Sequence, residues 1–161
     1  MTADEPAILG LLHRYCELQD AADVDAVSEL FAHAAYRVQG GPSVFGATSV
    51  AALKRAHDKV HDDGTFRTKH VTTNTIVELD PDGHRATTRS YFTVFQATAA
   101  LPLQCVIAGR YLDAFEKVDD RWRFTDRLIV SDLVGDLSHH IAGDPLGADA
   151  APDRRGGPGG S

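Results

Sequence analysis

His70 lies in a segment whose residue types suit the wall of a pocket. The segment FRTKHVTTNTIVELD, residues 66–80, is rich in Thr and Val, which is typical of a strand. If no bulge interrupts it, one face carries Phe66, Thr68, His70, Thr72, Asn74 and Ile76. A histidine with an ordinary pKa of about 6.5 is a natural general base at neutral pH. An outward-facing histidine, or one that only satisfies a hydrogen bond in the core, is the alternative.

Asp20 is a carboxylate at the end of a predicted helix. The helix has an apolar stripe made of Leu11, Leu12, Tyr15 and Leu18. A carboxylate at a helix C-terminus opposes the helix dipole, so the position is mildly unfavourable unless the acid has another task. Near a histidine, a carboxylate holds one tautomer of the ring and stabilises the imidazolium. Asp20 is therefore either a turn residue between two helices or the partner of such a histidine.

Two arginines, Arg110 and Arg127, lie in predicted strands that are otherwise rich in apolar residues. An inward-facing arginine would hold a substrate carboxylate or an enolate oxygen. The alternative is a cross-strand ion pair with Asp113, Glu116 or Asp126. Both arginines are candidate substrate-binding residues, and the sequence leaves the choice open.

Metal and nucleophile chemistry have little support in the sequence. His57 and His61 stand four residues apart on a predicted helix, but no third ligand is evident. His139 and His140 are adjacent in a predicted loop, and we interpret both pairs as surface features. No GxSxG motif is present that would mark a serine nucleophile. We therefore expect no metal and no cofactor.

The composition predicts a soluble cytoplasmic protein. The 161 residues have a formal net charge of −7, which argues against a nucleic-acid partner or an anionic membrane surface. No apolar run reaches the roughly 18 residues of a membrane span, and the N-terminus lacks a signal-peptide pattern. Cys16 and Cys105 are isolated, which is typical of a reducing compartment.

Hydrophobic periodicity and turn residues divide the chain into helices followed by strands. Helices are predicted from a start near residues 2–6 to residue 19, then over residues 24–32 and 50–61, with Asp23 as the N-cap of the second. Short strands are predicted at 35–39 and 44–46, and long strands at 65–79, 84–98, 103–118 and 121–133. The long strands form an antiparallel meander, because short connections such as DPDG join them.

This order predicts an α+β fold in which three N-terminal helices pack in a strongly bent antiparallel sheet, as in a cone-shaped α+β barrel. The open mouth of such a cone is a natural pocket for a small hydrophobic molecule. We assign residues 1–141 to this single domain. Residues 142–161 are rich in Gly and Pro and poor in large apolar side chains, so we expect a disordered tail.

The chain resembles the nuclear transport factor 2-like superfamily, and within it the SnoaL-like branch. The resemblance rests on the segments YCELQDAADVDAVSELF, FRTKHVTTNTIVELD and AGRYLDAFEKVDDRWRFTDR, and it covers roughly residues 5–135. Members of the superfamily include polyketide cyclases, scytalone dehydratase, a dehydrochlorinase, ketosteroid isomerase, oxygenase small subunits and non-enzymatic binding modules. Membership alone therefore does not fix a function.

For individual residues, the resemblance to dehydratases and the dehydrochlorinase is more specific. These proteins carry an aspartate in a Y-x4-D arrangement, met here by Tyr15 and Asp20, and a histidine shortly before an asparagine, met here by His70 and Asn74. The resemblance implies that His70 abstracts a proton and that Asp20 orients it. It also implies that Tyr36 binds substrate, and Tyr15, although its stripe indicates a core position, has a hydroxyl that could reach the same pocket.

The resemblance implies a cofactor-independent lyase or isomerase of dehydratase or cyclase type, acting on a hydrophobic oxygenated molecule in natural-product biosynthesis or catabolism. One alternative is a non-catalytic binding protein or a protein like an oxygenase small subunit. Another is an epoxide hydrolase, in which Arg110 with Asp113 or Asp126 would activate water. Exposed sheet faces in this fold commonly pair, so we also expect a homo-oligomer, either a dimer or a trimer.

Overall fold

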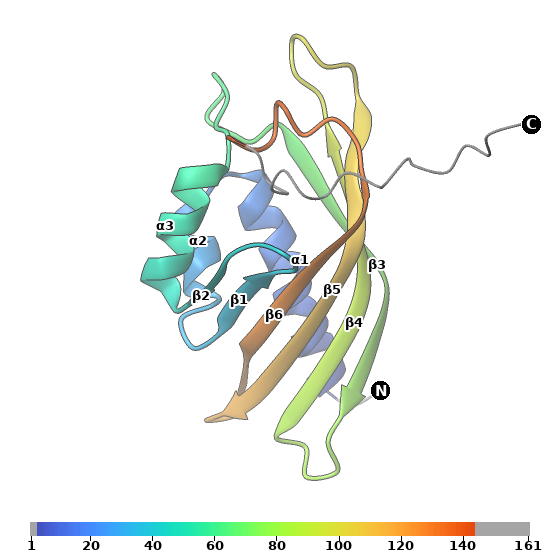
Figure 1. The fold of residues 1–161 in the computed structure, drawn as a ribbon. Coiled ribbons are helices and arrows are strands. Elements are labelled where there is room, and N and C mark those ends of the chain that lie inside the picture. The colour runs from blue at the N-terminus through green and yellow to red at the C-terminus, as the bar shows by residue number, and fades with distance from the viewer. Residues whose placement is uncertain (1–2, 144–161) are drawn as a thin grey trace, which may run out of the picture.

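The computed structural model describes residues 3–143 and shows a curved, unclosed sheet of six strands with three helices against its inner face (Figure 1). The helices are α1 (Asp4–Asp20), α2 (Val24–Glu29) and α3 (Ala47–His57). The strands are β1 (Ala35–Val38), β2 (Ser43–Phe45), β3 (Thr68–Leu79), β4 (Arg85–Gln96), β5 (Gln104–Val118) and β6 (Arg121–Val134). The predicted α+β cone is confirmed.

The turn between α1 and α2 leaves Asp20 free for another contact. The helix α1 ends at Asp20 and buries Leu12, Tyr15 and Leu18 of its predicted apolar stripe, while Leu11 is only partly buried. Ala22 then adopts a positive φ of 57°, which turns the chain sharply. Asp23 caps α2 as predicted, because its carboxylate accepts a hydrogen bond from the Ala26 N–H at 3.0 Å. Asp20 takes no part in this cap, and its side chain is directed toward β3.

The strands follow the order β2-β1-β6-β5-β4-β3 across the sheet. The predicted meander is confirmed, since β3 pairs with β4, β4 with β5 and β5 with β6, all antiparallel. The short strand β1 pairs parallel with β6, which the sequence did not predict. The helix α3 begins at Ala47, earlier than predicted, because Gly46 occupies its N-cap, and it ends at His57 rather than at residue 61.

A bulge in β3 changes which residues face inward. The pairing of β3 with β4 shifts between Thr73 and Ile76, and Asn74 adopts a positive φ of 40° there. A single extra residue moves the following side chains to the opposite face. Val77 therefore packs against the core, while Asn74 and Ile76 are exposed. The prediction that Asn74 shares the inward face of His70 is wrong.

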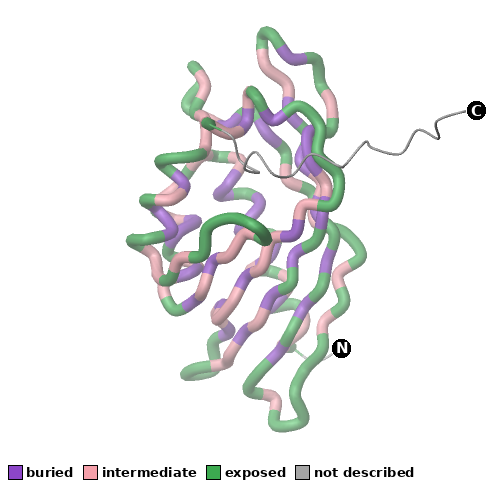
Figure 2. The backbone as a smooth tube through the Cα atoms, viewed as in Figure 1, coloured by how far each residue is buried: buried purple, intermediate pink, exposed green. Residues whose placement is uncertain are grey.

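The core lies between the helices and the sheet, where buried segments of both face each other (Figure 2). After β6, residues 135–143 run back toward the end of α3 (Figure 1), and we call this segment the strap. Ile141 of the strap forms an isolated antiparallel bridge with Asp58. Most of the predicted tail, residues 144–161, lies outside the described residues. Within residues 3–143, none of the helices has the length and apolar character that crossing a membrane requires.

Candidate active site

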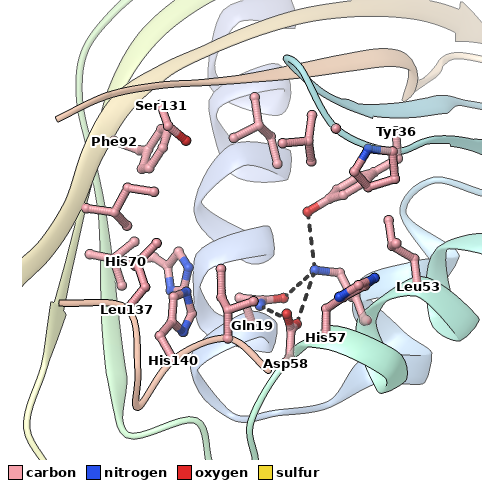
Figure 3. Close-up of a pocket in the computed structure, with 18 of the residues that line it drawn as sticks. Gln19, Tyr36, Leu53, His57, Asp58, His70, Phe92, Ser131, Leu137 and His140 are labelled. Carbon is pink, nitrogen blue, oxygen red and sulfur yellow. Dashed lines mark hydrogen bonds and ion pairs between the residues drawn. The ribbon is translucent and has the colours of Figure 1, made fainter. Parts of the chain in front are cut away.

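A cavity of about 330 Å³ opens between α1, α3 and the inner face of the sheet (Figure 3). Its apolar wall includes Val38, Leu53, Phe92, Val94, Ile129 and Ile141. The polar side chains gather at two sides, with His70 and His140 at one and Tyr36 at the other (Figure 3). A largely apolar cavity with a few convergent polar groups is the usual form of a small-molecule site, and this volume is near the lower end of the roughly 300–1,000 Å³ range.

His70 and Asp20 form a close pair at the cavity wall. The Nδ1 atom of His70 lies 2.6 Å from Oδ1 of Asp20, and the two side chains are only 5% and 11% exposed. An ionised carboxylate can only accept hydrogen bonds, so the ring proton must sit on Nδ1. The lone pair is then on Nε2, at the other end of the ring. This is the tautomer that a general base needs, and His70 lines the cavity.

Asp20 is held in place by further donors from β3. Its carboxylate accepts hydrogen bonds from the Thr68 hydroxyl at 2.9 Å and from the backbone N–H of His70, at 3.1 Å to Oδ1 and 3.0 Å to Oδ2. The carboxylate is therefore bound to both the backbone and the side chain of the same histidine. This contact explains why an acid stands at the end of α1, where the helix dipole disfavours it.

Two tyrosines and a lysine form a second polar group in the cavity. The hydroxyls of Tyr15 and Tyr36 lie 3.2 Å apart, and the buried ammonium of Lys54 donates to the Tyr36 hydroxyl at 3.3 Å. Lys54 also donates to Gln19 at 2.8 Å and lies 3.8 Å from the carboxylate of Asp58 (Figure 3). The ammonium charge is thus balanced by Asp58, and it polarises the Tyr36 hydroxyl.

The tyrosine pair offers a hydrogen-bond donor to a bound molecule. Burial raises the pKa of Tyr36 to about 12 and moves the pKa of Tyr15 upward too, so both hydroxyls keep their protons. In a hydrogen bond between two hydroxyls, one hydroxyl donates its proton and the other accepts. The O–H of the accepting hydroxyl is not used in this bond. Both side chains line the cavity. The remaining O–H is therefore available to an oxygen of a ligand.

The sequence did not single out Lys54, Gln19 or Asp58 as site residues. A signal was present for two of them, because each stands one helical turn after a buried residue on an apolar stripe. Gln19 follows Tyr15 by four residues, and Lys54 follows Val50 by four. A polar side chain that interrupts an apolar stripe at this spacing must be satisfied inside the protein.

Arg127 does not line the cavity but packs against Tyr15 and Tyr111, which do. Its side chain is fully buried and forms a bidentate ion pair with Asp113, at 2.7 and 2.8 Å. The guanidinium packs against the rings of Tyr15 and Tyr111, 4.3 and 4.0 Å from their centroids. Burial alone would lower the pKa of Arg127, but the Asp113 carboxylate outweighs it and the net direction is upward. The prediction of direct substrate binding by Arg127 is wrong, and the alternative of a cross-strand ion pair is confirmed.

Arg110 and Asn74 face away from the cavity. Arg110 is exposed and forms a bidentate ion pair with Asp132, with distances of 2.8 and 2.9 Å. Its predicted role in substrate binding is therefore wrong, and its partner is not one of the three acids considered. The arrangement of Arg110 with Asp113 or Asp126 that epoxide opening would require does not form at the cavity. Among residues 3–143, no three His, Cys, Asp or Glu side chains come together as a metal site would require.

His140 is a cavity residue that the sequence placed at the surface. It is only 7% exposed, and its ring centroid lies 6.1 Å from that of His70. Burial, and next the positive charge that His70 can carry, lower the pKa of His140 to about 4. The imidazole of His140 is therefore neutral at neutral pH.

This low pKa predicts a loss of stability in mild acid. As the pH falls from about 6.5 toward 4, His140 takes up a proton in the unfolded chain but not in the folded chain, so the unfolded state binds more protons. Between pH 7 and pH 4.5 the unmodified chain should lose about 2 kcal/mol more unfolding free energy than a His140→Gln variant. Urea denaturation at the two pH values measures this difference. Equal losses in the two chains would contradict the neutral state of His140.

The chain is similar to one known domain family and to several solved structures. The family model described as SnoaL-like domain matches residues 1–128. Among curated proteins, none matches the chain. A solved structure of a Mycobacterium tuberculosis protein of unknown function is 27% identical, with a TM-score of 0.67, and the match covers 81% of this chain and 73% of that one.

Two further solved structures come from Novosphingobium aromaticivorans. An NTF2-like protein with a cystatin-like fold is 25% identical, with a TM-score of 0.68, and the match covers 80% of this chain and 81% of that one. A scytalone-dehydratase-like protein is 19% identical, with a TM-score of 0.66, and the match covers 83% and 87% of the two chains. At this identity the second likeness concerns the fold alone.

Proposed function

The chain belongs to the SnoaL-like domain family, and on that premise we propose that it is a cofactor-independent lyase or isomerase, of dehydratase or cyclase type, acting on a hydrophobic oxygenated small molecule. The family membership agrees with the resemblance seen in the sequence, and the family includes isomerases, cyclases and dehydratases. It does not by itself select a reaction. The choice rests on the chemistry of the cavity.

The observation that carries the proposal is the His70–Asp20 pair at the wall of an apolar cavity. His70 Nε2 takes a proton from a carbon next to a carbonyl group, and Asp20 stabilises the imidazolium that forms. The electron pair of the broken C–H bond moves to the carbonyl oxygen. The spare O–H of the Tyr15–Tyr36 pair, backed by Lys54, donates to that oxygen as its charge develops.

The charges of the site favour a neutral substrate. Lys54 is paired with Asp58, and a second carboxylate, Asp20, stands behind His70. A substrate that already carries a negative charge would therefore find no uncompensated cation in the described part of the cavity. A neutral ketone, by contrast, develops its negative charge only during the reaction, when His70 becomes positive. The transition state is then stabilised more than the bound substrate, as catalysis requires.

Proton exchange at carbon tests the proposal without knowledge of the natural substrate. The probe is 4-phenylbutan-2-one, an apolar ketone whose C3 protons are adjacent to the carbonyl group. In D₂O at neutral pD, the chain should exchange these protons about a hundredfold faster than the same concentration of free imidazole. Proton NMR of the C3 signal measures the rate.

Absence of exchange would overturn the proposal. Chemical-shift changes of cavity residues on addition of the ketone, without exchange, would favour the second candidate, a non-catalytic protein that binds small molecules. The apolar wall of the cavity supports binding in either case.

A further inference from the structure

Asp58 is a second carboxylate at the cavity, and the proposed reaction uses it only to balance the charge of Lys54. It is the first residue after α3, where an acid opposes the helix dipole as Asp20 does at the end of α1. Its backbone is held on two sides, because its N–H donates to the Lys54 carbonyl at 2.7 Å and Ile141 of the strap forms a bridge with it. The side chain lines the cavity, and in the view of Figure 3 it lies between the two histidines and Tyr36.

The two oxygens of the Asp58 carboxylate differ in their surroundings. Oδ2 accepts a hydrogen bond from Nε2 of Gln19 at 3.1 Å and lies 3.8 Å from Nζ of Lys54. Oδ1 has no hydrogen-bond partner among residues 3–143, but it is accessible, unlike Nδ1 of His140, and the side chain is 15% exposed. An ionised carboxylate can only accept hydrogen bonds. Oδ1 is therefore an acceptor that a molecule in the cavity can use.

The neighbours of Asp58 fix the polarity of this part of the cavity. Lys54 donates to Oε1 of Gln19 at 2.8 Å, so the amide of Gln19 must present its NH₂ group to Asp58 (Figure 3). Both Lys54 and Gln19 are buried, which leaves them little freedom to rearrange. A ligand that meets Asp58 therefore meets a fixed acceptor whose charge the buried ammonium balances.

We propose that Oδ1 of Asp58 binds a hydroxyl group of the substrate that is remote from the reacting carbon, and that this contact selects the substrate. A hydroxyl donates a hydrogen bond to the carboxylate, and such charge-assisted bonds are stronger than neutral ones. An apolar ligand at the same place would cover Oδ1 without offering a donor, which is costly. The selected substrates are neutral ketones with a separate hydroxyl group. Naming this class rests on the proposed function, whereas the contact with Asp58 does not.

Ketones of similar size test the contact by binding alone. The parent 4-phenylbutan-2-one has no second oxygen, its hydroxyphenyl derivatives carry an O–H, and its methoxyphenyl derivatives carry the oxygen without the proton. The ortho, meta and para isomers are all used, because the ring position decides whether the group reaches Asp58. For at least one isomer, the Kd of the hydroxyphenyl ketone should be about tenfold or more below those of the parent and the matching methoxyphenyl ketone. NMR titration measures each Kd.

Asp58→Asn should abolish this preference. Because Gln19 presents its NH₂ group to position 58, the asparagine must turn its oxygen toward Gln19 and its own NH₂ toward the ligand. The Kd values of the hydroxyphenyl and methoxyphenyl ketones should then agree within about twofold. Comparing two ligands in one variant cancels any general change in the cavity. Asp62→Asn removes the same charge from an exposed position in the loop after α3 and should keep the preference.

A second measurement uses the unmodified chain, so it does not depend on the folding of a variant. The carbon-13 signal of the Asp58 carboxyl group should shift on binding of the preferred hydroxyphenyl ketone and not on binding of its methoxyphenyl counterpart. Equal shifts, no preference in any isomer, or a preference that survives in Asp58→Asn would overturn the role of Asp58. A preference that depends on Asp58 in a chain without C3 proton exchange would instead overturn the proposed function and leave this contact standing.

Discussion

Asp20→Asn should lower the rate of C3 proton exchange by about 10²–10⁴-fold while the chain stays folded. Three donors converge on the carboxylate, namely the Thr68 hydroxyl, the His70 backbone N–H and the His70 Nδ1–H. An asparagine has one oxygen and one NH₂ group. If its oxygen keeps the backbone N–H, its NH₂ faces Nδ1 of His70, which must then accept. The ring proton moves to Nε2, and the base has no lone pair toward the substrate.

Matched variants separate this effect from general damage to the site. His70→Gln should lose at least as much activity as Asp20→Asn, and the double variant should lose no more than His70→Gln alone, because the pair acts as a unit. Thr68→Val removes one donor to Asp20 without changing the tautomer, so its rate should fall less than about tenfold. Nitrogen-15 NMR of His70 reports the position of the ring proton directly. An unchanged rate in Asp20→Asn would remove Asp20 from the mechanism.

The sequence predicted the architecture because it depends on patterns that recur along the chain, whereas the pairing of Asp20 with His70 came from the family resemblance. The alternating Thr and Val residues marked β3, and the turn residues marked the meander, which β-pairing then confirmed. Asp20 and His70 were identified from their positions at the end of a helix and near the start of a strand. Their contact could not follow from spacing, since 50 residues separate them. It was implied by the family resemblance, and the structure shows its geometry.

The predicted positions of Asn74, Arg110 and His140 were wrong because they depend on irregularities that the alternation of polar and apolar residues in the sequence does not reveal. In TTNT, residues 72–75, every position is polar, so nothing in the sequence marks the extra residue that turns Asn74 outward. Arg110 lies in a strand with no clean alternation, and its partner Asp132 is 22 residues away on β6. His140 reaches the cavity only because the strap turns back onto the end of α3. Such a return is a tertiary feature without a local signal.

Arg127→Met should lower the free energy of unfolding by about 3–5 kcal/mol, because the carboxylate of Asp113 would remain buried without its partner. Both side chains are 0% exposed, so water cannot replace the lost ion pair. The guanidinium also packs against the rings of Tyr15 and Tyr111, which line the cavity, and its loss leaves a gap behind them. Such a loss is large against a typical domain stability of about 5–15 kcal/mol. Urea denaturation at neutral pH measures it.

Replacing both members of the pair distinguishes an unpaired charge from a loss of packing. The double variant Arg127→Met with Asp113→Leu should be more stable than Arg127→Met alone, because no charge is left buried. Arg127→Lys keeps the charge but not the bidentate fork, so its stability should lie between those of the unmodified chain and Arg127→Met. If the double variant instead loses as much unfolding free energy as the two single variants together, the packing of Arg127 against the tyrosines contributes more than the ion pair. In that case the exchange rate should fall with stability across the series, since Tyr15 would no longer be held beside Tyr36.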